Sequence, residues 1–480
     1  MKLLLMILAF CLTLDAKHIT IASYNVLNLF DGEYDGSEYR DFSKKRWTQK
    51  EYEEKLKKIV KVIKDIDADI IGLQEIENSN VLDELRETLG YRYSATMKKD
   101  NSAITIGLLS NLPITQVETL DVKHQRRGIL KVTVDIDSED LVLYINHWKS
   151  LNSPEKHRIA YAKALIKDIL TLKNEYIILG DLNSEYNRYI YLKGKTAINH
   201  ILKTTQNGAL VNKESIKENQ HYNLWLELPY QDRFSYLYKG RKSTLDAFVI
   251  PYQMFDGRGV DYVDASFEVF KPNYLYKNSK IDRSYSDHLP LKAEFSTDAY
   301  KISKKAHTEL YTVDELKNTK KLQKSVLLKN VVVIHKDKYG FVIKDSSGAI
   351  YIYAPKSNLD LGQIYDLEVL ETGQYHGLMQ IKAFDIVRLS KKTDREKLML
   401  KVDSQNLNRP EYLNEVVSSI KGVYKNNKLH YSGGSINLYF RDKSKRVKQG
   451  KRIEIKDARV SLYKSNPQLI ISKNTEVNEK

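Results

Sequence analysis

The sequence has almost no cysteine and only one long apolar run. A single one of its 480 residues is a cysteine, Cys11, and it lies inside the apolar run near the N-terminus. If that run is removed, the remaining chain holds no disulfide and no thiolate metal site. No other stretch of the sequence is long and apolar enough to cross a bilayer. Stability must therefore come from packing, with a bound cation as a further source.

The N-terminal apolar run has the pattern of a secretion signal. A lysine precedes residues 3–14, which are apolar but too short a stretch to span a membrane comfortably. A lipid anchor at Cys11 is disfavoured because the bulky Phe10 stands where such signals need a small residue. We predict that residues 1–16 are a signal peptide and that the protein is secreted or periplasmic.

The composition excludes a disordered chain and favours an anionic partner. Hydrophobic residues make up 42% of the sequence, enough for a sizeable core, and the length allows two or three domains. The net charge is +15 and the isoelectric point is about 9.2. Such a charge suits nucleic acid, anionic lipid or an acidic surface polymer. A basic protein without a polyanionic partner remains the alternative.

Strand and helix patterns alternate over residues 17–297. A capping box at residues 48–51 opens a helix whose apolar positions recur at helical spacing, and Ser153 with Pro154 is typical of an N-cap and first helical residue. Buried strands are expected at 18–24, 69–73, 103–109, 129–134, 141–145, 176–179, 246–250 and 289–295. The pattern predicts an α+β domain with two sheets flanked by helices.

The remainder of the chain changes to short strands and turns. Residues 298–323 are rich in lysine and weakly periodic, which suggests a linker with some helix. The segments at 349–355 and 361–369 resemble those at 435–441 and 449–457, which indicates two copies of one fold. We therefore predict two small β-barrel domains, of the OB-fold type, at 324–392 and 393–480.

The predicted barrels contain no catalytic cluster, but they contain aromatic strands near lysines. Their three histidines, at 335, 376 and 430, are scattered, so a metal site there is not expected. Tyr339, Phe341, Tyr351 and Tyr353 either stack bases or are ordinary core residues, and the sequence leaves the two alternatives open.

Polar residues that can bind metal or move protons lie at the ends of several predicted core strands. A carboxylate there costs several kcal/mol unless it is paired or bound to metal. Each residue alone is more often a turn or a cap, but one end of a sheet assembly can gather them all into one cleft. The set comprises Asn25, Glu75, His147, Asp181, Asn183, Asp246, Asp287 and His288. In this order they indicate a hard-cation site with acid/base histidines.

Five of the segments that carry these residues resemble the blocks of the endonuclease/exonuclease/phosphatase (DNase I-like) superfamily. They are residues 23–26, 73–75, 180–183, 244–246 and 286–288. The resemblance covers the whole first domain and implies a four-layer αββα sandwich. Three further segments, at 102–109, 146–150 and 234–236, are similar to the secreted bacterial nuclease branch.

The resemblance implies a Mg²⁺ or Mn²⁺ site. Glu75 would be the principal ligand, and Asn25 and Asp287 would lie in or next to the first coordination shell. Asp181 would orient or deprotonate the attacking water, and Asn183 would hydrogen-bond the phosphate.

The two histidines would act on the phosphate and on the leaving group. His288, oriented by Asp246, would bind the phosphate, and His147 would protonate the leaving oxygen. The sequence leaves the general base open between Asp181 and His288. The family's leaving-group histidine has a glutamate partner, and residues 101–105 offer none here, so the partner of His147 stays open.

Three further residues are candidates for contacts with phosphate or DNA. Lys149 and Ser150 follow the leaving-group histidine, and Arg127 aligns loosely with a DNA-contacting arginine. Arg127 could equally be a surface charge. Arg158 is the weaker candidate, because it fits a charge on the surface of a helix.

Together the motifs predict a secreted, metal-dependent nuclease. It would be a monomeric endonuclease of low sequence specificity that hydrolyses DNA, with RNA as a second substrate. A sphingomyelinase-like phosphodiesterase for lipid head groups is the first alternative, and residues 148–150 have the nuclease-like form that argues against it. A non-catalytic nucleic-acid-binding protein is the second, and the intact acidic and histidine set argues against that one.

Overall fold

The chain folds as two compact units in this computed structural model. Residues 17–97, 102–298, 300–301 and 308–479 are described, so the predicted signal peptide lies outside them. The first unit comprises the chain up to residue 184, with 216–228 and 233–303, and the second comprises 185–215, 229–232 and 304–480. No helix in the described ranges has the length and apolarity that a membrane span requires.

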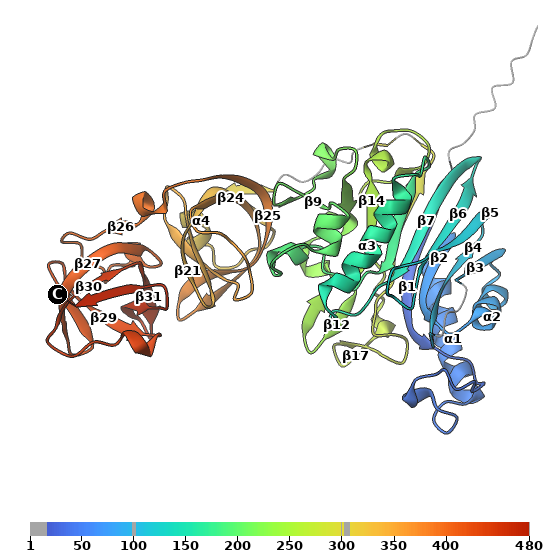
Figure 1. Ribbon diagram of the computed structural model, residues 1–480, viewed down its shortest axis with the longest axis horizontal. Helices are drawn as coiled ribbons and strands as arrows, with labels where there is room; N and C mark the ends of the chain where they lie inside the picture. Colours follow the sequence, from blue (N-terminus) through green and yellow to red (C-terminus); the bar gives the residue numbers. More distant parts are fainter. Residues whose placement is uncertain (1–16, 98–101, 299, 302–307, 480) are drawn as a thin grey trace, which may run out of the picture. The chain divides into compact units, whose positions relative to one another are not determined.

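The first unit is built on two mixed β-sheets (Figure 1). The strands of its first sheet are, in spatial order, β15 (Asp261–Tyr262), β19 (Leu291–Ser296), β1 (His18–Leu29), β2 (Ile70–Ile76), β4 (Thr105–Ser110) and β3 (Tyr93–Thr96), with β16 (Glu268–Val269) also on β19. Those of the second sheet are β11 (His221–Asn223), β14 (Asp246–Pro251), β8 (Tyr176–Asp181), β7 (Glu139–His147), β6 (Ile129–Ile136) and β5 (Ile114–Leu120). Only β1–β2 and β7–β8 run parallel within these two sheets.

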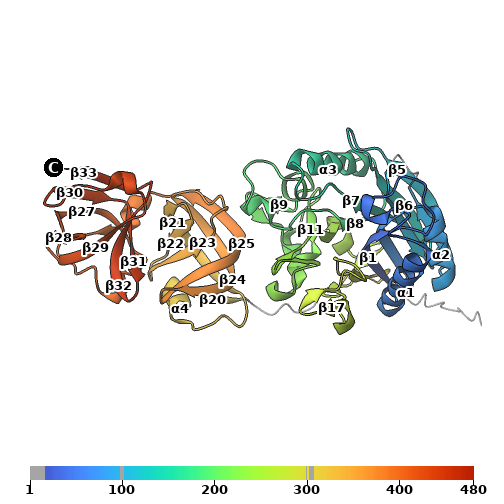
Figure 2. The same cartoon turned by 90° about the horizontal axis from the view of Figure 1, so that it is seen from below.

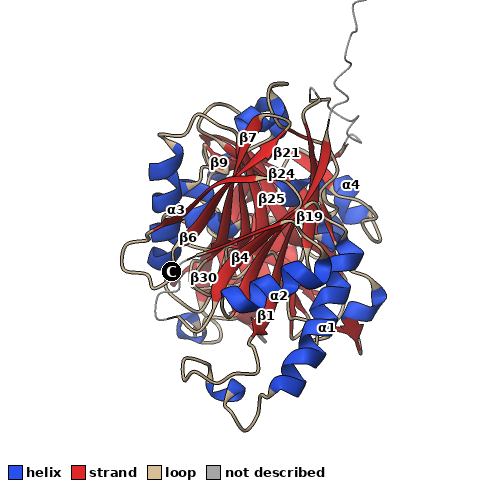
Figure 3. Ribbon diagram, turned by 90° about the vertical axis from the view of Figure 1, so that its right-hand side faces the viewer, coloured by secondary structure: helices blue, strands red, loops and turns tan. Residues whose placement is uncertain are grey.

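The two sheets pack face to face with helices outside them. A Cβ atom on Gly72 of β2 would lie 3.1 Å from the side chain of Ile145 on β7, so these faces meet. Side chains alternate along a strand, and the neighbouring Tyr144 accordingly points outward and donates to Asp168 of α3 (Glu155–Ile169) at 2.6 Å. Figure 3 shows α1 (Gln49–Ile66) and α2 (Ser79–Leu89) side by side across the first sheet. The layers are helix, sheet, sheet and helix.

Short sequence motifs predict the first residue of α1 and α3 to within one residue. The capping box at Thr48 and Glu51 is present, with the Thr48 side chain accepting from the backbone and Glu51 bonding back to it. Helix α3 begins one residue later than predicted, because Pro154 occupies the N-cap position and Glu155 the first turn. A proline side chain cannot accept a hydrogen bond, so this N-terminus has no side-chain cap.

The second unit contains a closed five-stranded barrel (Figure 2). Its elements are β20 (Glu309–Tyr311), α4 (Val313–Asn318), β21 (Val326–Asp337), β22 (Gly340–Lys344), β23 (Ala349–Tyr353), β24 (Gln363–Tyr375) and β25 (Leu378–Lys392). The spatial order is β21-β22-β23-β25-β24 and back to β21, with β23 and β25 parallel. The predicted linker, residues 298–323, is in part a piece of this barrel. Its part around α4 belongs to the barrel, because Val313 and Leu316 are buried in the barrel core.

A second closed barrel follows with the same strand order. Its strands are β26 (Leu400–Lys401), β27 (Val416–Lys425), β28 (Lys428–Tyr431), β29 (Gly434–Phe440), β30 (Arg452–Lys456), β31 (Ala458–Tyr463), β32 (Asn466–Ile471) and β33 (Glu476–Glu479). It closes as β27-β28-β29-β32-β31, with β29 and β32 parallel. Strands β30 and β31 are separated at Asp457, whose φ of 56° interrupts the extended backbone. The sequence pairs found above fall on equivalent strands, β23 with β29 and the first half of β24 with β30, because β30 and β31 together take the place of β24.

A segment inside the predicted catalytic domain belongs to the second unit. Ile190 and Ala209 lie in the core of the first barrel, and Asn187 and Tyr186 donate to the buried carboxylate of Asp385 at 3.0 and 2.9 Å. The segment contains the short strands β9 (Thr205–Gln206) and β10 (Ala209–Leu210). Residues 185–215 therefore depart from the predicted 17–297 boundary, because their apolar partners lie beyond residue 312.

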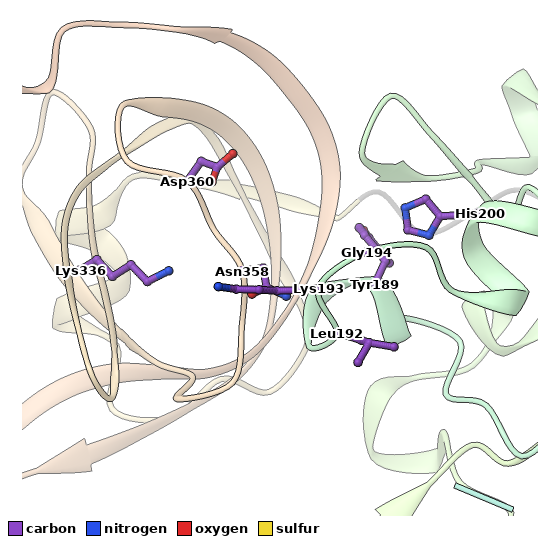
Figure 4. A pocket seen from close by; sticks show the side chains of 8 residues that line it. All are labelled: Tyr189, Leu192, Lys193, Gly194, His200, Lys336, Asn358 and Asp360. Carbon is purple, nitrogen blue, oxygen red and sulfur yellow. The ribbon is translucent and has the colours of Figure 1, made fainter. Parts of the chain in front are cut away.

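A pocket of about 370 Å³ lies between this segment and the first barrel (Figure 4). Its lining residues are Tyr189, Leu192, Lys193, Gly194, His200, Lys336, Asn358 and Asp360. The mixed charges of this lining indicate no single ligand.

The small hairpins of the first unit complete the fold. They are β12 (Tyr236–Tyr238) with β13 (Arg241–Ser243), and β17 (Tyr276–Lys277) with β18 (Lys280–Ile281). The first of these lies against the strand-end cluster described next, since Tyr236 forms a bridge with His288.

Candidate active site

Strand ends from both sheets meet at one edge of the sandwich. In the second sheet His147 of β7 and Asp246 of β14 both stand in register with Asp181 of β8. In the first sheet Asn25 of β1 pairs with Gln74, next to Glu75. The five predicted site residues on these strands are thereby gathered into one region, as one end of a sheet assembly allows.

Glu75 reaches this region because its backbone departs from the strand. Its φ is 66°, in the left-handed region, and the register of β2 with both neighbours shifts there. A non-glycine residue in that conformation is strained, and such strain is concentrated at functional sites. The turn directs the Glu75 carboxylate toward the second sheet, where the backbone N–H of Asn28 and the side chain of Asn25 donate to it, each at 3.0 Å.

Asn25 joins two carboxylates from opposite sheets. Its Nδ2 donates to Glu75 Oε1 at 3.0 Å and to Asp181 Oδ2 at 3.2 Å, while its Oδ1 accepts from the backbone of Leu27. Burial raises the pKa of Glu75 above its usual range, and burial likewise raises that of Asp181. Asn25 therefore holds two carboxylates close together in a place where water no longer stabilises their charge.

The donor set at this point suits a hard divalent cation. Ligand atoms of Glu75, His147 and Asp181 lie within 4.8 Å of one another. Of the predicted ligands, Glu75 is in this group, Asn25 turns its nitrogen to the carboxylates, and Asp287 lies on the neighbouring loop with Arg283 bonded to it at 2.7 Å. Two buried carboxylate groups need a compensating charge, and Mg²⁺ or Mn²⁺ prefers such oxygens.

His288 is held as a cation. Its Nδ1 lies 2.7 Å from Asp246 Oδ2, and its Nε2 lies 4.0 Å from Asp287. Burial alone would lower the pKa of His288, but Asp246 and the neighbouring carboxylates raise it to about 10. The ring of Tyr236 lies beside it, 5.0 Å away between centroids. An imidazolium fixed in this way binds anionic oxygen and does not accept a proton at neutral pH.

His147 has a cation as its partner in place of a carboxylate. Arg127 Nη1 donates to His147 Nδ1 at 2.6 Å, so Arg127 points into the site. The predicted surface-charge alternative for Arg127 is therefore wrong. Burial, Arg127, His288 and Lys149 together hold the pKa of His147 well below its usual range. His147 is consequently a neutral imidazole whose Nε2 faces Glu75 and Asp181 at 3.5 and 3.7 Å.

The loops around the site are fixed by short hydrogen bonds. Asn183, at a φ of 46°, donates from its backbone to Asp181 at 2.9 Å and from its side chain to the carbonyl of Trp148 at 3.2 Å. Ser286 donates to the carbonyl of Asn25 at 2.6 Å. Lys149 is half-buried and its charge acts on His147, whereas Ser150 is exposed.

Arg158 is buried, against the prediction of a helix-surface charge. Its guanidinium donates to the carbonyls of Lys149, Ser150 and Ser153 and pairs with Glu155 at 2.8 Å. These bonds add side-chain donors to the loop after β7, whose Ser150 carbonyl also accepts from the backbone N–H of Ser153. Arg158 thus orients the loop and has no free group for a substrate.

One lysine of the site was missed. Lys55 of α1 donates to the carbonyl of Tyr285, and burial lowers its pKa to about 7 although Asp287 and Glu75 oppose the shift. The sequence did carry a signal, because Lys55 stands between Tyr52 and Leu56 on the apolar stripe of the helix. A lysine on a buried stripe indicates a structural or catalytic partner.

The sequence comparison decides the family. The model of the endonuclease/exonuclease/phosphatase family matches residues 20–290, which is more than half of the chain. The chain belongs to the endonuclease/exonuclease/phosphatase family. Members of this family are hydrolases that act on phosphodiester bonds. No curated protein matches the chain.

Solved structures of the family resemble the first part of the chain. Zebrafish TDP2 carrying 14 humanizing mutations is 14% identical, covers 58% of this chain and 98% of its own, and has a TM-score of 0.40. The human Nocturnin catalytic domain with bound sulfate is 16% identical over 58% and 96%, with a TM-score of 0.40. A family protein from Bacteroides thetaiotaomicron is 14% identical over 59% and 99%, also with a TM-score of 0.40.

Proposed function

We propose that the protein is a secreted, divalent-metal-dependent nuclease that cuts DNA internally with low sequence specificity, with RNA as a second substrate. The observation that carries the proposal is the double hydrogen bond from Asn25 to Glu75 and Asp181, with the His288–Asp246 pair on the adjoining strand ends. This set combines an oxygen site for a cation, a buried carboxylate and a fixed imidazolium. Hydrolysis of a phosphodiester by water needs all three.

The titration behaviour of the two candidate bases favours Asp181. Its pKa is raised by burial, so the carboxylate accepts a proton more readily than an exposed aspartate does. His288 already carries its proton at neutral pH because its pKa is about 10. We therefore assign deprotonation of the attacking water to Asp181, and binding of the phosphate to His288.

A bound Mg²⁺ or Mn²⁺ would polarise the phosphate and offset its developing charge. Glu75 would hold it, since its carboxylate is partly buried and its oxygen lies within 4.8 Å of ligand atoms of His147 and Asp181. Asn25 positions that carboxylate, and Asp287 contributes negative charge from the adjoining loop.

The opposite wall of the site is basic and suits the leaving side of the phosphate. Arg127 carries a permanent charge, and Lys149 lies beside it with a pKa that burial and the neighbouring arginines lower. Neutral His147 can donate a hydrogen bond from Nε2, but because its pKa is held well below the usual range, the ring is not protonated at neutral pH and has no imidazolium proton to transfer. The leaving oxygen would therefore be stabilised by cations and take its proton from water.

The extracellular location and the type of the two barrels are parts of the same proposal. Secretion is supported by the apolar leader and by the absence of cysteine after it. The order of strands, with the third and fifth parallel, supports an OB fold for each barrel.

A digestion panel tests the proposal directly. Wild type should nick plasmid DNA with Mg²⁺ or Mn²⁺ and lose this activity in chelator, while Asp181→Ala and His288→Ala should be inactive but folded. Linear DNA, RNA and a sphingolipid are the competing substrates. Cleavage of the sphingolipid alone would assign the site to lipid head groups, and no metal-dependent cleavage of any substrate would leave the non-catalytic alternative.

A further inference from the structure

Almost all of the net positive charge belongs to the C-terminal part of the chain. Residues 304–480 contain 34 Lys and Arg against 20 Asp and Glu, a net charge of +14. Residues 1–303 contain 43 against 42, a net charge of +1. The candidate active site lies in the first unit, so the basic character serves a part of the chain that carries no catalytic group. Charge of this sign and density attracts a polyanion.

The two barrels are joined by buried charged contacts. Arg441 of the second barrel bonds to Asp337 of the first at 2.8 Å, and His335 of the first bonds to Asp457 of the second at 2.6 Å. Arg459 lies over the ring of Tyr351 at 4.0 Å. These contacts hold the two barrels in a fixed arrangement, because separating an arginine from its carboxylate would leave a buried charge without a partner. Side chains from both barrels therefore form one continuous surface at the junction.

Aromatic rings and cations alternate on that surface. Tyr353 is 42% exposed and Tyr339 is 37% exposed, and the backbone pairing of β22 with β23 sets them at the same end of the barrel. Lys382 lies 4.4 Å from the ring centre of Tyr353, and Arg441 lies 5.0 Å from that of Tyr339. Rings in a core do not remain this exposed, so the alternative of ordinary core residues applies to Tyr351 and not to these two.

A basic loop continues from Arg441. Between residues 441 and 452 the chain has seven Lys or Arg and one acidic residue, Asp442, whose carboxylate caps the short helix at 443–445. Within the described part of the chain, Lys443 and Lys448 are exposed and form no ion pair. These unpaired cations lie on the loop that begins at Arg441, the residue over the ring of Tyr339, so the loop offers phosphate-binding groups and the ring a stacking group.

We infer that this surface is a second, non-catalytic site that binds single-stranded DNA. Cations neutralise the phosphates, and unpaired bases stack on the tyrosines beside them. A duplex hides its base faces, and an acidic polysaccharide has none, so neither would use the rings. The inference extends the proposed nuclease function, because a strand held here would be retained between cuts, yet the binding itself requires no catalysis.

The test measures binding without turnover. Fluorescence anisotropy of an oligo-dT of about 30 nucleotides, longer than a single OB-type site of ~4–16 nucleotides, is followed with the full chain in EDTA. Affinity should fall steeply between about 50 and 200 mM salt. Heparin and a duplex of the same length are the competing ligands.

Two sets of variants separate stacking from charge. Tyr339→Leu with Tyr353→Leu should weaken oligo-dT binding on the order of 10- to 100-fold with the salt slope unchanged, and should leave heparin binding within twofold. Tyr93→Leu, an exposed tyrosine of the first unit, is the matched control.

Lys443→Glu with Lys448→Glu should weaken both ligands and reduce the salt slope. The control makes the same charge change at the exposed Lys57 and Lys64 of α1.

Unchanged oligo-dT binding in the tyrosine variant, or equal losses for heparin, would overturn the inference. Heparin binding far tighter than oligo-dT binding would assign the surface to acidic polysaccharide instead. Intact oligo-dT binding by a chain that never cleaves plasmid would overturn the proposed nuclease function alone.

Discussion

At the residue scale, the site depends on a few side chains that each serve two partners. Asn25 holds carboxylates of two sheets, and Asp246 holds the imidazole of His288 while its backbone carbonyl accepts from Trp225. The same side chains therefore hold strands together and fix the groups of the candidate site. Replacing one of them changes the protonation of a neighbour as well as removing a contact.

Replacing Asp246 should remove the charge from His288. In Asp246→Asn the burial that lowers the His288 pKa is no longer opposed by its main partner, so the ring becomes neutral near pH 7. We expect turnover to fall on the order of 10²- to 10⁴-fold, with partial recovery at lower pH where the ring is protonated again. The pH profile of plasmid nicking measures this. A uniform loss at every pH would contradict the charge argument.

The same pair should make stability depend on pH. The His288 pKa is about 10 in the folded state and ~6.5 in the unfolded one, so the stabilisation is complete below about pH 6.5 and is lost as pH rises toward 10. The loss should amount to a few kcal/mol. Urea unfolding in EDTA at intervals across this range measures it, with His288→Asn as the control that should flatten the curve. An equal slope in wild type and control would refute the assignment.

At the element scale, the loop after β7 is set by α3. Arg158 comes from the helix and reaches three carbonyls of the loop that carries Lys149 and Ser150. The loop has no regular structure, and Arg158 adds to the bonds that Asn183 makes to the carbonyl of Trp148 and that the backbone N–H of Ser153 makes to the carbonyl of Ser150. Buried backbone carbonyls need hydrogen-bond donors, and a buried guanidinium can supply several of them at once.

Arg158→Met should therefore destabilise the first unit and loosen the loop. Loss of the guanidinium removes its ion pair with Glu155 and its hydrogen bonds to the carbonyls of Lys149, Ser150 and Ser153, which costs about 2–4 kcal/mol. Chemical denaturation and hydrogen exchange of the loop amides measure the two effects. Lys163→Met, an exposed position of the same helix, is the control and should change stability by less than about 0.5 kcal/mol.

Elements were predictable where the signal is local. The capping box at residues 48–51 and the strands β7 and β8, expected at 141–145 and 176–179, follow from the sequence because a few neighbouring residues determine them. The contact of Arg127 with His147 was not predictable, because it joins residues 20 apart through a loop. The burial of Arg158 was not predictable either, because it depends on a loop whose sequence shows no helix or strand periodicity.

At the scale of the whole molecule, the catalytic sequence and the first barrel share one core. Residues 185–215 follow the strand-end segment at Asn183, yet Ile190 and Ala209 pack among barrel residues. No periodicity reveals such packing, since the partners lie far along the chain. The family blocks on either side of the segment were recognisable because they stand at strand ends.

A chain that ends at residue 297 should therefore fold poorly. It lacks the partners of Ile190 and Ala209 and leaves Tyr186 and Asn187 without Asp385. We expect cleavage by trypsin within 185–215 and a lower yield of soluble protein than for the full chain. Asp385→Ala should reproduce part of the protease sensitivity in the full chain, and the exposed Asp394→Ala is the control. A protease-resistant, active fragment would contradict this expectation.

The position of residues 185–215 also limits how this protein can evolve. A domain joined only by its ends can be lost or exchanged by one recombination event at the boundary. Here such an event near residue 300 would separate Ile190 and Ala209 from the residues that cover them. We expect the barrel and the catalytic sequence to be inherited together, and variation in one to be constrained by the other.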